Sequence, residues 1–213
     1  VGSVAADSKR LAATQARQFV FTHFNSTRGL ASNYVNNIIQ DAKGFMWLAT
    51  ANGLQRYDGN KFSTYQSDPG NPQSLPDDNI AFVYVDKKQN LWVGTADNKV
   101  GIFNTSNFTY KEVKLDLKTP LTVYYPKMIL ETSGGDLLLA ITSIGILQYN
   151  VRKNVLEYTT SYVPIPNKWR LINISEDVVT KRLWLATDSG IAVFDPVTRH
   201  LSYRGNNVDS NPM

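Results

Sequence analysis

The sequence contains no cysteine, only two histidines and no long hydrophobic run. The absence of cysteine excludes a disulfide framework, thiolate catalysis and cysteine-based metal sites. His23 and His200 lie near opposite ends of the chain, on predicted outer strands, which favours structural roles over metal binding or base catalysis. Apolar runs such as residues 137–141 are far shorter than the roughly 20 residues that a membrane-spanning helix needs. We therefore expect no catalytic residues, no metal and no cofactor.

Neither sign of charge is concentrated in one part of the chain. The 22 lysines and arginines exceed the 18 aspartates and glutamates by a net +4, and they are scattered at predicted turns. Nucleic-acid binding usually leaves a clustered basic stripe, so we expect no direct contact with nucleic acid. With 42% hydrophobic and 19% charged residues, the composition is that of an ordered protein with a sizeable core.

A tryptophan recurs at a regular interval. Trp47 and Trp92 are 45 positions apart, and Trp184 follows after a further 92, which is twice 46. The intermediate copy is expected near position 138, where Leu138 occupies the same short apolar motif. Periods of this size indicate stacked supersecondary units. The chain thus contains four repeats, at approximately residues 19–66, 67–111, 112–159 and 160–205, followed by the start of another linker.

Each repeat predicts four short strands. Aromatic and branched residues alternate with Gly, Asn and Asp turns, which is the signal for antiparallel hairpins. In the first repeat the expected strands are 34–40, 45–50, 54–57 and 61–65, and the other three repeats follow the same order. The fold class is therefore all-β, a β-propeller fragment of about four four-stranded antiparallel blades of 45–46 residues. We expect the repeated Trp47, Trp92 and Trp184, and Leu138 in the third copy, to pack between blades.

The two ends of the chain predict a fragment. Residues 19–24 suggest a strand that belongs to a blade whose other strands lie elsewhere, and residues 206–213 parallel the linker at 67–72. Four blades are at the lower limit of closure, so an open arc and a part of a larger ring both remain possible. Residues 1–18 are expected to be flexible or a short helix, and a signal-peptide remnant is an alternative.

The residues of the first repeat carry a family resemblance. The pattern consists of Gly29, Leu30, Val35, Ile38, Asp41, Gly44, the Trp47 motif, Gly53, Leu54, Tyr57, Asp58, Phe62 and Tyr65. It resembles the two-component regulator propeller repeat, and the resemblance extends over about residues 19–213. It is weakest in the third repeat, where Leu138 and Ile141 replace Trp and Thr.

The resemblance implies the N-terminal part of a periplasmic sensor region of a hybrid two-component system. Further propeller blades, an immunoglobulin-like domain, a membrane helix, a histidine kinase and a response regulator would follow, and the sensor region would be a homodimer. The implied ligand is an oligosaccharide, and its binding would alter kinase output. This step from fold to function is an analogy.

The predicted binding residues lie on loops at one face of the propeller, where chain segments enter the inner strands and turns follow the tryptophan strands. Aromatic and polar residues there suit sugars, although Asn and Asp also simply form turns. Trp169, together with Arg170, is the strongest candidate because it falls outside the tryptophan register. The predicted set is Arg28, Asn33, Tyr34, Asn52, Asp77, Asp78, Asp97, Asn98, Tyr124, Tyr125, Trp169, Arg170 and Asp188.

Two alternatives to sensing remain at this stage. A glycan-active enzyme such as a lyase would need a His, Tyr or carboxylate cluster assembled from distant loops. A protein-interaction propeller would need an extended partner surface and no small-molecule pocket. The recurrent Asp41 and Asp86 are expected to bond their own turns rather than to bind calcium.

Overall fold

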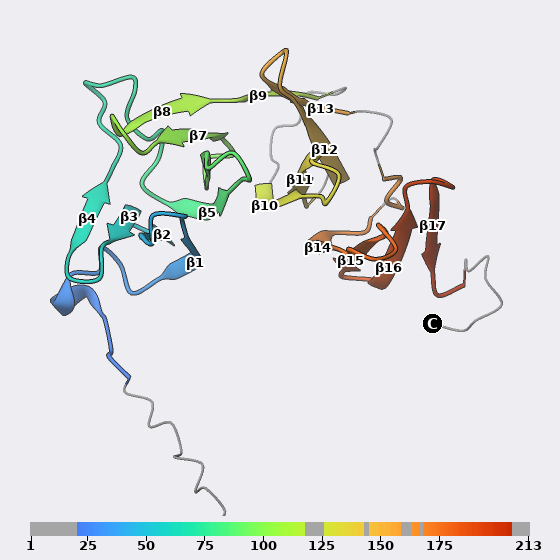
Figure 1. Cartoon of the computed structure of the whole chain (residues 1–213), viewed down its shortest axis with the longest axis horizontal. Coiled ribbons are helices and arrows are strands. Elements are labelled where there is room, and N and C mark those ends of the chain that lie inside the picture. The colour runs from blue at the N-terminus through green and yellow to red at the C-terminus, as the bar shows by residue number, and fades with distance from the viewer. Residues whose placement is uncertain (1–20, 118–125, 143–144, 159–162, 167, 206–213) are drawn as a thin grey trace, which may run out of the picture.

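A computed structural model describes residues 21–117, 126–142, 145–158, 163–166 and 168–205, which form four antiparallel meanders (Figure 1). This confirms the predicted all-β, propeller-type fold class. The first two sheets have four strands each, in chain order. They consist of β1 (Val35–Gln40), β2 (Met46–Thr50), β3 (Gly53–Tyr57) and β4 (Phe62–Tyr65), and of β5 (Ile80–Val85), β6 (Leu91–Thr95), β7 (Val100–Asn104) and β8 (Thr109–Glu112).

The third sheet has a fifth strand that the sequence did not indicate. β9 (Lys114–Asp116) pairs in parallel with the last strand of the meander, β13 (Val155–Glu157). The remaining strands of the third and fourth sheets follow the predicted meander order. They are β10 (Pro126–Glu131), β11 (Leu137–Ile141), β12 (Gly145–Asn150) and β13 (Val155–Glu157), then β14 (Leu171–Glu176), β15 (Leu183–Thr187), β16 (Gly190–Asp195) and β17 (His200–Tyr203).

The predicted strand at residues 19–24 is wrong in its described part. Residues 21–24 form no strand, and a short 3-10 helix, η1 (Ser26–Arg28), follows them. Phe24 instead packs edge-on against Tyr57 and Phe62, with ring centroids 5.3 and 5.5 Å apart. The segment is therefore held by aromatic packing rather than by strand pairing. Residues 1–18 and 206–213 lie outside the described residues.

The four sheets follow one another as an arc (Figure 1). The first strands of successive sheets lie side by side, because β1 contacts β5, β5 contacts β10, and β10 contacts β14. Each of these inner strands also carries a register shift at the same place, for example between Val35 and Asn37 in β1 and between Ile80 and Phe82 in β5. The four blades therefore share the same backbone irregularity as well as the same strand order.

The core consists of three apolar clusters, one between each pair of neighbouring sheets. Trp47 lies in the first cluster and Trp92 in the second, both 0% exposed, and Leu138 lies in the third. Trp184 differs, because 44% of it is exposed on the face of the fourth sheet that no described sheet covers. Tryptophan at this position is therefore buried where a following sheet is present.

Asp41 and Asp86 each organise the hairpin that precedes a tryptophan. Asp41 Oδ1 accepts hydrogen bonds from the backbone N–H groups of Lys43 and Phe45, and its Oδ2 accepts one from the Trp47 indole at 2.8 Å. Asp86 repeats this arrangement and accepts the Trp92 indole N–H at 3.0 Å. Both carboxylates are thus committed to their turns, and no group of three or more potential metal ligands occurs in the described part of the chain. None of the described helices is long and apolar enough to cross a membrane.

Candidate functional site

One end of the sheets gathers the loops in which the sequence predicted a binding site. We call it the entry face, and it comprises the residues that precede β1, β5 and β14 together with the turns after β2, β6 and β15. A backbone hydrogen bond joins these two sets in the first, second and fourth sheets, such as Ala51 N–H to Tyr34 C=O at 3.1 Å and Asp188 N–H to Arg170 C=O at 3.1 Å. This repeated bond brings residues from distant parts of the sequence to the same surface.

Most of the predicted polar residues on the entry face hold loops in place. Asn33, Asp78 and Asp188 each accept a hydrogen bond from a backbone N–H group, namely from Ser26, Ser67 and Arg170. The first two bonds each lie within one connecting segment, and the third joins two different connections. The Asn52 amide donates to the Ala31 carbonyl at 3.2 Å, and Asp77 accepts from the Asn79 N–H. These residue types occur here because they satisfy turn backbone, which is the alternative that the sequence left open.

The predicted aromatic and cationic residues are spread along the face. Trp169 is half-buried and packs edge-on against Tyr203, with ring centroids 4.9 Å apart, which accounts for a tryptophan outside the repeat register. Arg170 is exposed beside it, and Tyr34 is 78% exposed. Arg28 donates to the His23 carbonyl at 3.3 Å. Tyr124 and Tyr125 lie outside the described residues, so their predicted role stays a prediction.

A cavity of about 360 Å³ lies between the second sheet and the linker that leads into it from the first sheet. Residues 67–76, which include three prolines, form one wall, and Lys99, Tyr110 and Glu112 form the other. Tyr110 is 8% exposed, and its hydroxyl is buried without a hydrogen-bond partner among the described residues. An unpaired buried hydroxyl costs about 1–3 kcal/mol, so a ligand or a water molecule that bonds it would recover this energy.

One ion pair holds a charged side chain of this cavity, Lys99, in place. Lys99 Nζ lies 2.9 Å from Asp97 Oδ2. Burial raises the pKa of Asp97, but hydrogen bonds from Thr95 and Lys99 outweigh it and hold the pKa below its ordinary value. Burial raises the pKa of Tyr110, and the nearby Glu112 and Asp97 carboxylates add to the rise. The Tyr110 hydroxyl therefore stays protonated at physiological pH and is able to donate a hydrogen bond.

The lining suits an uncharged, hydroxyl-rich ligand. Proline rings offer apolar faces, the Tyr110 hydroxyl donates or accepts, and the Glu112 and Asp68 carboxylates accept hydrogen bonds. Sequence reasoning identified the linker at 67–72 and the neighbouring Asp97, but treated Tyr110 only as part of a strand. The burial of a tyrosine in an outer strand depends on how the linker folds back, and this is a tertiary property.

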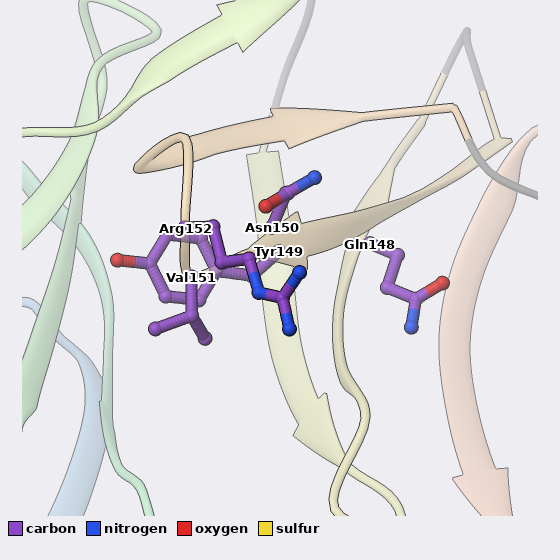
Figure 2. Close-up of a pocket in the computed structure, with 5 residues that line it drawn as sticks. All are labelled: Gln148, Tyr149, Asn150, Val151 and Arg152. Atoms are coloured by element: carbon purple, nitrogen blue, oxygen red, sulfur yellow. The ribbon is translucent and has the colours of Figure 1, made fainter.

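A second hollow, of about 390 Å³, lies at the opposite end of the third sheet and is lined by residues 148–152 (Figure 2). Gln148 and Tyr149 point to opposite sides of β12. Within this hairpin, Tyr149 donates to Asn154 and the Asn150 amide donates to Glu157. These side chains bond each other within a single hairpin, so the cavity beside Tyr110 is the better candidate.

Comparison with known proteins agrees with this architecture. Residues 29–52 and 74–97 match the two-component regulator propeller repeat. Histidine kinase P4 from Formosa agariphila is 36% identical over 61 residues, which are 29% of this chain and 4% of the kinase. The chain thus spans a small part of this relative.

Solved structures show the same fold. The extracellular domain of a hybrid two-component system from B. thetaiotaomicron has a TM-score of 0.72 at 23% identity, over 87% of this chain and 27% of that one. Virginiamycin B lyase from Staphylococcus aureus has a TM-score of 0.57 at 18% identity, over 79% of this chain and 54% of the lyase. The two matched segments lead to one conclusion: residues 29–52 and 74–97 of this chain are two copies of the two-component regulator propeller repeat.

Proposed function

We propose that this chain is part of the extracytoplasmic, ligand-sensing propeller of a hybrid two-component sensor, located in the periplasm, and that it responds to an oligosaccharide. The observation that carries the proposal is the pair of two-component regulator propeller repeats at residues 29–52 and 74–97. The chain itself contributes ligand binding, while a histidine kinase elsewhere in the protein supplies the enzymatic output. Further blades, downstream periplasmic domains and a second copy of the protein are its proposed partners.

The cavity beside Tyr110 supports the oligosaccharide as ligand. It lies on the entry face and combines apolar proline faces with hydroxyl and carboxylate groups, which is the mixture that sugar rings need. Its volume of about 360 Å³ is within the ordinary range of small-ligand sites. The Tyr110 oxygen is enclosed and has no partner among the described residues, so a ligand hydroxyl that displaces its neighbours and reaches it would also pair it.

Calorimetric titration with a panel of oligosaccharides tests the proposal, on the full chain and on the intact extracellular region. We expect one glycan class to bind, and Tyr110→Phe to weaken this binding by about fivefold, since one hydrogen bond contributes about 1 kcal/mol. Tyr57→Phe is the matched control, because the Tyr57 hydroxyl donates to Gly59 in a hairpin away from the cavity. Failure of every glycan class to bind the intact region would refute the sensing function. Binding that Tyr110→Phe leaves unchanged would place the site elsewhere.

A glycan-active lyase is the second candidate function, and the similarity to a lyase propeller is the observation that favours it. This similarity lies at 18% identity and therefore concerns the fold alone. The intact protein should be incubated with the glycan that binds best, and the products followed by mass spectrometry. Under the sensing proposal the glycan is recovered unchanged, whereas sustained cleavage would establish the enzyme.

A further inference from the structure

Each buried tryptophan of the repeat sits in the same kind of slot. Trp47 packs edge-on against Phe103 of the next sheet, with ring centroids 5.9 Å apart, and shares its cluster with Leu91. Trp92 packs edge-on against Tyr149 of the next sheet at 4.8 Å and shares its cluster with Leu137. An aspartate at the preceding hairpin accepts the indole N–H in both cases. The slot thus has an apolar floor, an aromatic wall and a hydrogen-bond acceptor at its mouth.

The third sheet keeps this slot but lacks both residues that fill it. Leu138 pairs with Leu130 in the register in which Trp47 pairs with Ile39 and Trp92 with Tyr84. The hairpin position held by aspartate in the first two sheets is Thr132, whose N–H donates to the Asp136 carbonyl, just as the Asp86 N–H donates to that of Asn90. Two substitutions at interacting positions therefore remove the indole and its acceptor together.

The slot between the third and fourth sheets is an open cavity of about 320 Å³. Its floor is apolar and consists of Leu138, Leu183 and Phe194, which are 2%, 5% and 1% exposed and belong to one core cluster. Phe194 lies on the third strand of its sheet, as do Phe103 and Tyr149 in theirs. The cavity therefore has the apolar floor and the aromatic wall that hold an indole ring elsewhere in the same chain.

The rim of this cavity supplies hydrogen-bond acceptors in place of the missing aspartate. It includes Thr132, Asp136 and Glu176. Asp136 accepts from the Gln148 amide, and Glu176 accepts from the Ser133 hydroxyl at 3.0 Å. Each carboxylate has further acceptor capacity, because a carboxylate offers about four lone-pair sites. A ring N–H at the mouth of the cavity would therefore find an acceptor, as the indoles of Trp47 and Trp92 do.

We propose that this cavity binds a free planar aromatic heterocycle with a ring N–H, of the indole class, between the third and fourth sheets. The ring would take the place that a tryptophan side chain takes in the first two slots, with its face against Leu138 and Leu183 and its N–H directed to the acidic rim. The site lies at the end of the sheets opposite the entry face, so the proposal is independent of oligosaccharide sensing. Such a ligand would strengthen the contact between two blades of the arc.

Indole itself is the probe. A nine-atom ligand of this kind is expected to bind with a Kd on the order of 0.1–1 mM. At tenfold excess over Kd, indole should raise the Tm of the full chain by about 3 °C. Leu138→Trp should fill the cavity, raise the Tm without ligand and abolish the response to indole. Trp184→Leu is the matched control, because it removes the exposed tryptophan on the other face of the fourth sheet and should leave the response unchanged.

Nuclear Overhauser effects between indole protons and the methyl groups of Leu138 and Leu183 locate the ligand in the unsubstituted chain. This measurement decides the proposal even if Leu138→Trp does not fold. Contacts to these methyl groups would support it. Absence of binding at millimolar indole, contacts only to other residues, or loss of the Tm shift in Trp184→Leu would overturn it.

Discussion

Two tryptophans at equivalent repeat positions have opposite environments. Trp92 is 0% exposed, donates its indole N–H to Asp86 and packs on Tyr149. Trp184 is 44% exposed and lies outside the three core clusters. The same side chain therefore contributes differently to stability in the second and fourth sheets, because burial sets the contribution of an aromatic ring.

Truncation of the two tryptophans should show this difference. Trp92→Ala should lower the free energy of unfolding by about 3–5 kcal/mol, the usual loss for a buried aromatic residue. Trp184→Ala should cost about 1 kcal/mol or less, as expected for a partly exposed site. Urea unfolding of the full chain measures both values. Equal losses would mean that the exposed face of the fourth sheet is covered in solution.

A glycine in the second tryptophan strand is explained by its neighbour. Gly94 stands where the other sheets have Ala49, Ala140 and Ala186, and it pairs with Phe82 across the sheet. A Cβ atom on Gly94 would lie 2.1 Å from the Phe82 ring. The large Phe82 on β5 thus requires glycine at position 94 on β6. This compensation becomes visible only when the strand pairing is known.

At the scale of the element, the hairpin that precedes each tryptophan strand is the most regular part of the blade. Asp86 is 6% exposed and accepts four hydrogen bonds, from the backbone of Lys88, from the backbone and side chain of Asn90, and from the Trp92 indole. Asp177 occupies the same position in the fourth sheet, but its partners are the nearby Val179 and Thr180 in an exposed turn. The first carboxylate connects a turn to the core, and the second stabilises only the turn.

Replacement of these aspartates should separate the two roles. Asp86→Ala leaves several buried donors unpaired and should lower the free energy of unfolding by about 2–4 kcal/mol. Asp177→Ala should lower the free energy of unfolding by about 1 kcal/mol, since the groups that donate to Asp177 can form hydrogen bonds with water instead. Denaturant titration, with hydrogen exchange of the Trp92 indole as a local probe, measures the effects. If Asp86→Ala leaves the indole proton protected, another acceptor holds it.

The strands could be predicted because their signals are local. Short runs of aromatic and branched residues between Gly, Asn and Asp turns located the four strands of each meander to within about two residues. β9 was missed because a three-residue strand has no periodicity of its own, and its pairing with β13 depends on how the third sheet packs. Residues 19–24 were expected as a strand because they resemble the fourth strand of a blade. Pairing needs a neighbouring strand, and in the described part, residues 21–24, Phe24 packs against aromatic side chains instead.

At the scale of the whole molecule, the four sheets form an arc, and each pair of neighbouring sheets encloses one apolar cluster. The apolar side chains of each sheet are therefore buried by the neighbouring sheets. The entry face could be predicted from the repeat alone, because the repeat fixes which loops share an end. The cavity beside Tyr110 could not, since it depends on the path of residues 67–76. The degenerate third repeat identified Leu138 as the residue in the tryptophan position, but the cavity beside it depends on the packing of two sheets and was not predicted.

Acid sensitivity is a property of the molecule as a whole, because hydrogen bonds in several hairpins act on carboxyl groups in the same direction. Hydrogen bonds from Lys61, Thr180 and Thr198, respectively, are the main causes that hold the pKa values of Asp58, Asp177 and Asp195 below the ordinary range. The folded chain therefore binds fewer protons than the unfolded chain just below the unfolded pKa of about 4. The stability that these groups contribute is present above that pH and is lost as the pH falls through their folded pKa values.

The urea midpoint should accordingly be constant with respect to these groups between about pH 5 and 7 and should fall below about pH 4. Unfolding curves at half-unit intervals from pH 2.5 to 7 measure the profile, by the slope relation between stability and proton binding. The variant Asp195→Asn should have a shallower acid limb than the unsubstituted chain. A midpoint that rises on acidification would contradict the assignment.

The parallel strand β9 has a mechanical consequence for the arc. It follows β8 after a single residue, Val113, which is 1% exposed, and then lies along the outer edge of the next sheet. The chain therefore pairs with the last meander strand of the third sheet before it forms the first strand of that sheet, and β9 links the second sheet to the third. Because β13 is paired on both sides, the outer edge of this sheet is the three-residue strand β9, and a strand this short is a poor template for a foreign strand. Peeling the third sheet from the second requires β9 to detach first, so the two sheets should resist an outward pulling force as one unit.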